Sequence, residues 1–245
     1  MNTIDKLIKS HRSVRRYQQE NNIDEEVILD MIRVAQHASS SHFVQAYSII
    51  MVSDQELKER LSSLSSNSHV ATCNKFLLFC ADLERLNIAC NMHGKVIESQ
   101  SAENLLVATI DTALVAQNFS LIAESRGYGI CFIGGMRNEP ILISELLKLP
   151  KKVFPLFGMA IGIPDEQNEV KPRLPIESIV HKDFYDSSQY EAILKFYDQQ
   201  MKVYYQSRSE NKKDIGWSEP MSDYMSHKNR MDMMKHLNEK GFNRD

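Results

Sequence analysis

The sequence predicts a single domain that combines helices and strands, either α+β or mixed α/β. Short apolar runs of strand length alternate along the chain with segments of helical periodicity. Residues 96–126 contain neither glycine nor proline, and they predict one long helix near the middle of the chain. No segment repeats and no low-complexity linker divides the sequence, so its 245 residues are interpreted as one domain with a sizeable core.

The first half of the chain is predicted to begin with two helices. Thr3 can cap the first, in which three apolar residues share one face, and Asp24 opens the second. Ser39–Ser41 then breaks the helical pattern and predicts a turn. The elements expected after this turn are a strand at 46–52, a helix opened by Asp54 and running through Leu64, a polar loop at 62–67, and a strand at 76–81 that is buried on both faces.

The second half is predicted to continue the alternation. Its expected elements are the helix at 96–126 stopped by Gly127, a strand at 129–133, a helix opened by Pro140, a strand at 153–163, a proline-stiffened loop at 171–175, a helix at 188–205, a charged loop at 207–214 and a helix at 230–240 ended by Gly241. Apolar residues cover more than one face of the 96–126 helix. This pattern indicates a helix in the core or in a dimer interface.

Composition indicates an ordinary cytoplasmic protein. The formal net charge is -3 and the sequence pI is about 6.3, which disfavours a nucleic-acid partner. The N-terminus has no apolar signal core, and no apolar run is expected to approach the roughly 18 residues of a membrane span. The four cysteines, Cys73, Cys80, Cys90 and Cys131, lack the spacing of a zinc site, so no metal is expected and the thiols are predicted to be free and mostly buried.

A basic cluster stands at residues 11–16, directly after the first predicted helix. Its sequence, His-Arg-Ser-Val-Arg-Arg, holds three guanidiniums, an imidazole and a hydroxyl. Such a cluster can be a solvated surface, a phosphate site or a nucleic-acid site. The acidic balance of the chain disfavours nucleic acid, and taken alone the cluster is more often a solvated face.

Other residues favour a phosphate site. Lys171 and Arg173 form a second basic arm stiffened by prolines, Ser39–Ser41 offers hydroxyl groups, and Gly134 with Gly135 offers backbone N–H groups. Together these groups suit a phosphorylated, planar ligand, provided that the fold brings them together. The sequence contains no P-loop, zinc-protease or nucleophile-elbow motif and no complete dinucleotide-binding glycine motif.

Five motifs in order, HRSVRRY, ASSSHFVQAYSII, IAESRGYGICFIGGMRN, LFGMAIGIP and KPRLP, resemble the nitroreductase superfamily. The chain is most similar to the flavin reductase and oxygen-insensitive NAD(P)H nitroreductase branch, in which a charged loop precedes Trp-Ser, as before Trp217 here. The resemblance covers essentially the whole chain. It implies an intertwined homodimer of α+β subunits, each with a mixed sheet flanked by helices and a C-terminal extension, and one FMN at each of two sites between the subunits.

The resemblance also implies which residues contact FMN. Phosphate and ribityl contacts fall on the basic cluster and the second arm, a glycine N–H faces flavin N5, and Asn67 stands where family members often have a longer glutamine. Arg16 does not match a flavin position. The matching residues are His11, Arg12, Ser13, Arg15, Ser40, Asn67, Phe132, Ile133, Gly134, Gly135, Lys171 and Arg173.

A mobile loop of the family binds the 2′-phosphate of NADPH, and Arg208 matches its arginine, with Lys212, Lys213 and Arg230 as further candidate contacts. The loop is equally well interpreted as an exposed turn, which leaves NADPH and NADH both open as donors. The implied reaction is ping-pong two-electron transfer from NAD(P)H through FMN to a nitroaromatic, a quinone or free flavin, with no catalytic side chain. The rival interpretation is a non-enzymatic flavin or nucleotide sensor on the same fold.

Overall fold

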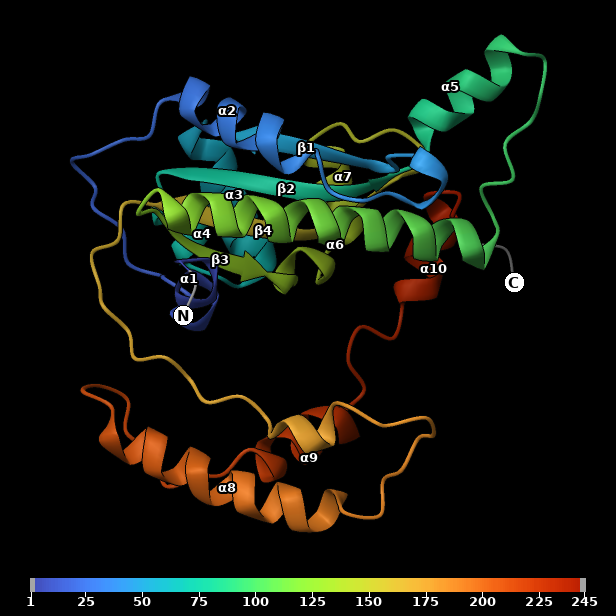
Figure 1. Ribbon diagram of the computed structural model, residues 1–245. Helices are drawn as coiled ribbons and strands as arrows, with labels where there is room; N and C mark the ends of the chain where they lie inside the picture. Colours follow the sequence, from blue (N-terminus) through green and yellow to red (C-terminus); the bar gives the residue numbers. More distant parts are fainter. Residues whose placement is uncertain (1–2, 243–245) are drawn as a thin grey trace. The chain divides into compact units, whose positions relative to one another are not determined.

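The computed structural model describes residues 3–242, which form two compact units (Figure 1). The first unit comprises the chain up to Asn168 together with the segment from Arg230 onward, and the second comprises Glu169–Asn229. The return of the chain from the second unit to the first means that the two cannot be separated by one cut. The prediction of a single domain stays a prediction.

The first unit is a sheet with helices on both faces. Its strands are β1 (Tyr47–Val52), β2 (Lys75–Asp82), β3 (Gly129–Ile133) and β4 (Val153–Gly162). Its α-helices are α1 (Thr3–Lys9), α2 (Glu25–Ala35), α3 (Gln55–Ser65), α4 (His69–Thr72), α5 (Glu84–Met92), α6 (Ala102–Ser125), α7 (Pro140–Leu146) and α10 (Met233–Glu239), and the short 3-10 turns η1 (Ser41–Phe43) and η2 (Gly134–Arg137) lie between them.

The four strands are arranged in the order β1-β2-β4-β3, and every pairing among them is antiparallel. The chain was expected to form a mixed sheet, but within residues 3–242 its named strands show no parallel neighbours. The reason is topological: β2 and β3 run in the same direction, and β4 lies between them and is antiparallel to both. The α+β class is confirmed.

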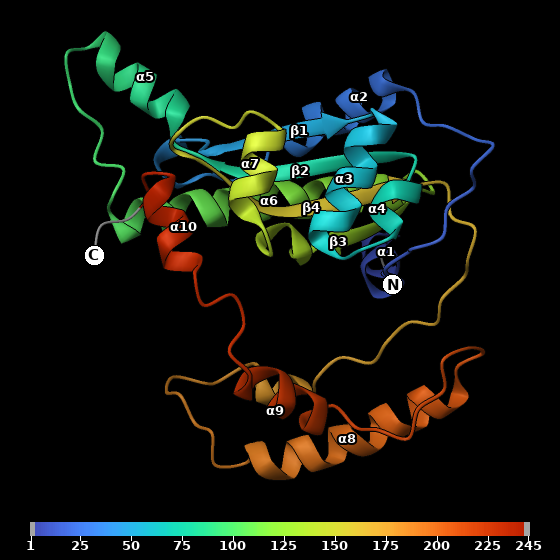
Figure 2. The ribbon, with the colours of Figure 1, turned by 180° about the vertical axis from the view of Figure 1, so that it is seen from behind.

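Two helical layers enclose the sheet. Helices α2 and α6 cover one face, and α3, α4 and α7 cover the other, as the views from the two sides show (Figures 1 and 2). Strand β2 is buried along its whole length. Its side chains alternate, so that Phe76 and Leu78 pack beneath the α3–α7 layer while Leu77 and Phe79 pack against the α2–α6 layer. The continuous apolar run in the sequence is thus the signature of a strand buried on both faces.

The long helix predicted at 96–126 begins later than expected, because Ser101 caps α6 by accepting a hydrogen bond from Glu103 N. Gly127, with φ +84°, follows its last turn as predicted. The expectation that no apolar run approaches a membrane span is wrong for this helix, which has 24 residues and a mean hydropathy of 1.6 over 18 of them. It packs against α2 and three strands of the sheet, and it is therefore a core helix.

Other sequence-based predictions also differ from the structure. The predicted polar loop at 62–67 is largely helical, since α3 continues to Ser65 before Ser66 adopts a left-handed conformation with φ 56°. Helix α5 was not predicted, because it buries none of its residues and carries no clear apolar stripe. Helix α9 (Ser218–Ser226) was not predicted either. Its Pro220 lies in the first turn, where proline is tolerated.

The second unit consists of η3 (Ile176–Ser178), α8 (Tyr190–Ser207) and α9. Asp198 on α8 joins its two helices by accepting hydrogen bonds from Trp217 N at 2.6 Å and Ser218 N at 2.8 Å. Burial raises the pKa of Asp198, but these bonds outweigh it and the net shift is downward. The carboxylate thus acts as a cap for the start of α9.

The cysteines are free, as predicted, and Cys73, Cys80 and Cys131 are buried. Burial raises the pKa of the Cys73 thiol to about 12, and it raises the pKa of Cys80 and Cys131 as well. A thiol rather than a thiolate is a poor nucleophile, so these three side chains are packing residues at neutral pH.

Candidate functional site

The basic cluster runs as an extended segment beside β3 and the end of β4. Val14 N donates to Ile130 O at 2.9 Å, and Gln18 N donates to Ile163 O at 3.0 Å. Val14 and Tyr17 are buried and anchor the segment. A Cβ on Gly129 would meet the Val14 side chain at 2.7 to 2.8 Å, so this close approach requires glycine. The backbone of the cluster is therefore fixed by the sheet.

The side chains between these anchors face outward, and a carboxylate orders them. Glu166 accepts a hydrogen bond from Arg15 N at 2.6 Å and forms an ion pair with Arg16 Nε at 3.3 Å. The guanidiniums of Arg15 and Arg16 remain exposed. Arg12 Nη1 donates to Ser10 O at 3.2 Å. The exclusion of Arg16 from the flavin set stays a prediction.

Ser13 and His69 place the cluster next to two other elements. Ser13 and Arg15 lie near the Cys131 thiol of β3, where burial raises the pKa of the thiol and both residues lower it by less. His69, at the start of α4, lies close enough to Arg15 for the charge of Arg15 to affect its pKa. Burial lowers the pKa of His69, and Arg15 lowers it further. His69 Nε2 is buried and has no hydrogen-bond partner among the described residues. Sequence reasoning did not select His69.

The glycine turn after β3 meets the loop before α4. A Cβ on Gly135 would lie 2.3 Å from Ser65 O and 2.5 Å from Asn67 Nδ2. Asn67 Nδ2 itself donates to Ser65 O at 2.6 Å. Asn67 therefore lies beside Gly135, and only glycine fits at this position.

Phe132 and Ile133 point in opposite directions. Phe132 is 39% exposed and contacts the Phe157 ring, with centroids 5.6 Å apart, whereas Ile133 is 2% exposed. Strand alternation produces this difference. A ligand beside β3 can contact the Phe132 side chain, but only the backbone of Ile133.

Arg230 belongs to the first unit and binds the glycine turn. Its Nη2 donates to Gly134 O at 3.3 Å and to Asn138 Oδ1 at 2.8 Å, and its Nε donates to the same oxygen at 3.0 Å. Its predicted contact with a nicotinamide phosphate stays a prediction. The arrangement adds a cation to the Gly134–Gly135 turn.

Ser40 lies elsewhere along the first unit. Its hydroxyl donates to Asp111 on α6 at 2.7 Å and accepts from Gln45 N at 2.8 Å. His11 is held by Glu124 on the same helix, with Nδ1 and Oε1 2.6 Å apart. Asp111 and Glu124 are thirteen residues apart, which is about 20 Å along a helix. Within a single chain, Ser40 therefore does not lie beside His11.

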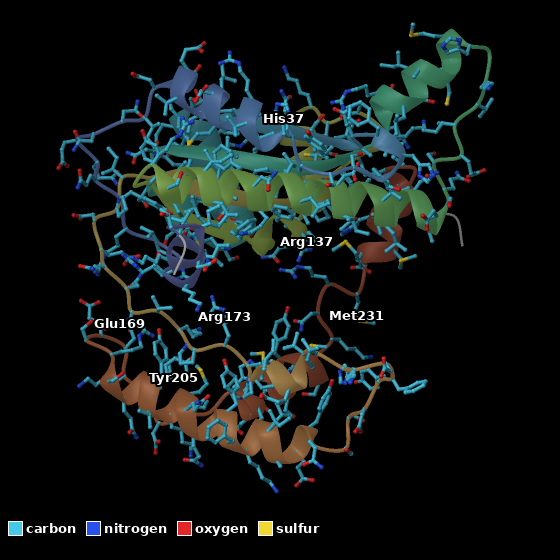
Figure 3. All side chains as sticks on the ribbon, in the orientation of Figure 1. His37, Arg137, Glu169, Arg173, Tyr205 and Met231 are labelled. Carbon is cyan, nitrogen blue, oxygen red and sulfur yellow. The ribbon has the colours of Figure 1, made fainter. Side chains whose placement is uncertain are left out.

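The second unit carries the other predicted residues (Figure 3). Arg173 Nη1 donates to Lys171 O at 2.7 Å, and Lys171 Nζ lies 5.8 Å from the centre of the Tyr205 ring. Both basic side chains are exposed. Tyr197 on α8 holds the intervening Pro172 by donating to its carbonyl at 2.9 Å. The arm is thus ordered within its own unit.

Arg208, at the end of α8, forms an ion pair with Glu169 in which Nε and Oε2 are 3.9 Å apart. A hydrogen bond from Ser209 N lowers the pKa of Glu169. Lys212 and Lys213 follow in the exposed loop. The region is basic at its surface, but its arginine is already partly neutralised by a carboxylate.

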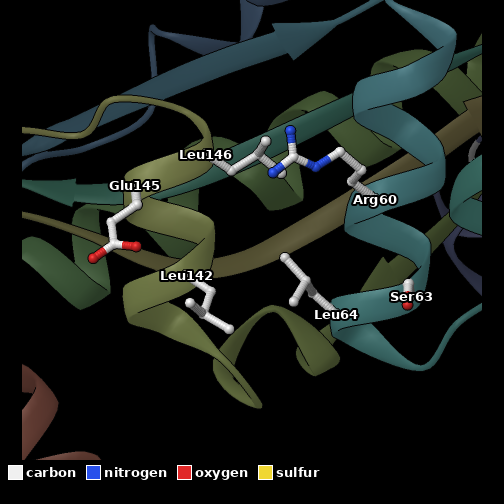
Figure 4. Close-up of a pocket in the computed structure, with 6 residues that line it drawn as sticks. All are labelled: Arg60, Ser63, Leu64, Leu142, Glu145 and Leu146. Atoms are coloured by element: carbon white, nitrogen blue, oxygen red, sulfur yellow. The ribbon is translucent and has the colours of Figure 1, made fainter.

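A hollow of about 550 Å³ lies between α3 and α7 (Figure 4). These two helices lie on the face of the sheet away from α6 (Figure 2). Its lining consists of Arg60, Ser63, Leu64, Leu142, Glu145 and Leu146. None of the predicted flavin contacts is among these residues. Volume alone therefore does not identify the functional site.

The groups of the first unit fit a flat ring that carries a phosphate. Outward guanidiniums and a buried, unpartnered His69 Nε2 stand at one end of β3, and an exposed aromatic ring with a close glycine turn stands at the other. Guanidiniums bind phosphate oxygens, and an exposed aromatic ring packs against a planar one. Within residues 3–242, no cluster of metal-ligating side chains was found.

Comparison with known proteins identifies the family. Residues 8–163 match the Nitroreductase family, and residues 171–245 match the Nitroreductase family, C-terminal domain. A Cr(VI) reductase of Pseudomonas sp. (strain G-1) is 46% identical over 241 residues, covering 98% of this chain and 99% of the relative. The FMN reductase (NADPH) of Bacillus subtilis is 39% identical over the full length of both proteins.

The fold agrees with this relationship. The NfrA1 nitroreductase from B. subtilis superposes with a TM-score of 0.94 at 38% identity, covering 99% of this chain and 100% of that one. The shared sheet, the flanking helices and the C-terminal segment account for this coverage. This chain therefore belongs to the nitroreductase family and is an oxidoreductase.

Proposed function

We propose that this oxidoreductase uses FMN to transfer two electrons from NADPH, or NADH, to a nitroaromatic compound, a quinone or free flavin. The observation that carries the proposal is the fixed position of the basic cluster along β3, beside His69 and in the same unit as the Asn67–Gly135 contact. When bound, FMN supplies the redox chemistry. The protein contributes binding, orientation and charge.

The roles of the side chains follow from their chemistry. Arg12 and Arg15 would hold the phosphate, and the contacts of Lys171 and Arg173 with FMN stay predictions from the family resemblance. Phe132 would pack against the ring system, and the Gly134–Gly135 backbone would approach it closely because no side chain intervenes. Basic groups near a flavin favour its reduced, anionic form. This arrangement requires no nucleophile, which agrees with the absence of a nucleophile-elbow motif from the sequence.

Colour and turnover test the proposal directly. The purified protein is expected to be yellow, to release FMN on denaturation, and to oxidise NADPH when a quinone or nitroaromatic is added. A colourless protein that takes up no FMN would contradict the flavin assignment. Bound flavin without turnover on any acceptor would instead favour the sensor interpretation, which the enzymatic relatives do not support. We place the enzyme in the cytoplasm.

The flavin site is proposed to lie between two subunits of a homodimer. Ser40 is separated from His11 within one chain, so a second copy is needed to bring such a residue to the site. On α6, Leu106, Ile110 and Leu114 repeat at every fourth position and are 57%, 55% and 41% exposed. An unpartnered apolar stripe on a core helix suits a subunit interface.

Replacing Ile110 by glutamate is expected to convert the dimer to a monomer, because it places a charge in the apolar stripe of α6. Sedimentation velocity measures the change, and flavin content is expected to fall with it. Leu142→Glu is the matched control, since Leu142 is 47% exposed on α7, which lies on the opposite face of the sheet (Figure 2). If both variants remain dimers, the α6 stripe is not the interface.

Replacing Arg208 by alanine is expected to raise the KM for NADPH on the order of tenfold and to leave the KM for NADH nearly unchanged. The reason is that only NADPH carries the 2′-phosphate that a guanidinium would bind. Lys195→Ala is the control in the same unit, because Lys195 is exposed and its ion pair is with Glu191, one helical turn away. Equal effects of Arg208→Ala on both donors would remove this role.

A further inference from the structure

A carboxylate from the far end of the central helix holds the first residue of the basic cluster. His11 Nδ1 and Glu124 Oε1 are 2.6 Å apart, although the residues are separated by 113 positions in the sequence. His11 follows α1, and Glu124 lies in the last turn of α6. The side chain of Glu124 is 12% exposed, and that of His11 is 31% exposed.

The position of Glu124 is unfavourable for the helix itself. A negative charge in the last turn opposes the helix dipole, and a carboxylate withdrawn from water loses hydration energy. Its second oxygen, Oε2, is inaccessible and has no hydrogen-bond partner among the described residues. The local stability of α6 therefore does not explain why a carboxylate stands at this position. The contact of Glu124 with His11 does explain it.

The contact determines which nitrogen of the His11 imidazole is available to a ligand. A carboxylate only accepts hydrogen bonds, so Nδ1 carries the proton that lies between the two groups. Nε2 is left as the nitrogen available to a ligand, and no hydrogen bond from it to another residue in 3–242 is found. Arg12 and Glu166 are the other charged residues near Glu124, and the three line a cavity of about 150 Å³ that does not include His11 in its lining.

We propose that Glu124 is a positioning residue for the flavin phosphate and acts through His11. It accepts the Nδ1–H bond and thereby orients the ring, so that Nε2 is left to share a hydrogen bond with a phosphate oxygen. The inference rests on the proposed function, because it takes the ligand of the basic cluster to be FMN.

The competing interpretation predicts the opposite effect of neutralising Glu124 on the affinity for FMN. If Glu124 were only a nearby negative charge, its neutralisation would reduce repulsion and strengthen the binding of a phosphate dianion. If Glu124 orients His11, neutralisation weakens that binding. Riboflavin separates both cases from a general loss of structure, since it has the same ring and ribityl chain as FMN but no phosphate.

The experiment is a double-mutant cycle on protein stripped of its flavin, with dissociation constants for FMN and riboflavin measured by fluorescence quenching. The variants are Glu124→Gln, His11→Phe and the double variant. Glu103→Gln is the control, because it makes the same change at the exposed other end of α6. Glu124→Gln preserves size and a hydrogen-bond acceptor, which favours retention of the fold, and circular dichroism checks each variant.

Glu124→Gln is expected to weaken FMN binding on the order of tenfold and riboflavin binding less than twofold. In the His11→Phe background the same change is expected to have no further effect on FMN. Tighter FMN binding by Glu124→Gln, equal losses for both flavins, or an undiminished effect in the His11→Phe background would each overturn the inference. If the unmutated protein binds FMN no more tightly than riboflavin, the proposed phosphate site itself is wrong.

Discussion

Replacing Asp111 by alanine is expected to lower the free energy of unfolding by about 3 kcal/mol, because three donors lose their acceptor. Asp111 is 1% exposed on α6. It accepts hydrogen bonds from Ser40 Oγ at 2.7 Å, Ala46 N at 3.1 Å and Ser41 N at 3.3 Å. The carboxylate thus fixes both ends of the segment 40–46, which precedes β1.

This segment needs this support because its backbone is strained. His42, Phe43 and Gln45 have φ values of 48°, 59° and 51°, in the left-handed region that side chains disfavour. Without Asp111, the segment is expected to relax to ordinary conformations, which would displace Ser40 as well. Flavin content of the folded variant is therefore expected to fall together with its stability.

Urea unfolding followed by circular dichroism measures the change. Asp111→Asn retains one carbonyl oxygen and is expected to lose roughly half as much stability. Asp30→Ala serves as the control for the loss of a carboxylate: Asp30 forms an exposed ion pair with Arg126 at 2.7 Å, and such pairs contribute less than about 1 kcal/mol. Equal losses for Asp111→Ala and Asp30→Ala would show that the three hydrogen bonds contribute little.

Sequence patterns predicted the elements that have strong local signals. Strand β2 was predicted because it is apolar throughout, and α3 because Asp54 caps it by accepting from Leu57 N at 2.8 Å. Helix α5 was missed because it buries no residue and so has no periodic apolar face. The order β1-β2-β4-β3 could not be derived, since nothing local in β4 specifies that it pairs with both β2 and β3.

For the candidate site, too, the sequence selected some residues and missed others. The motifs of the family resemblance selected Asn67 and Gly135, and the structure places them side by side. The carboxylates that hold His11 and Ser40 were not selected. Glu124 and Asp111 lie in a long helix, where an acidic residue is usually interpreted as part of the solvated face. Their partners, His11 and Ser40, are distant in the sequence, so only the fold reveals the contacts.

Replacing Arg15 by glutamine is expected to weaken FMN binding about 100-fold, because charge-assisted hydrogen bonds to a phosphate contribute about 1.5 to 3 kcal/mol. The backbone of Arg15 is held by Glu166, and this hydrogen bond survives the substitution since it uses Arg15 N. The loss is therefore expected to come from the side chain alone. Riboflavin affinity, measured by the same fluorescence titration, is expected to change less than threefold.

Arg16→Gln is the matched control for this prediction. It removes the same charge from the adjacent residue, but the guanidinium of Arg16 forms an ion pair with Glu166. If a general basic field attracted the flavin, the two variants would weaken FMN binding equally, and both effects would fall with added salt. If Arg15 binds the phosphate directly, its variant alone shows a large loss that persists at high salt. The ratio of the two dissociation constants thus distinguishes a built phosphate site from a basic surface.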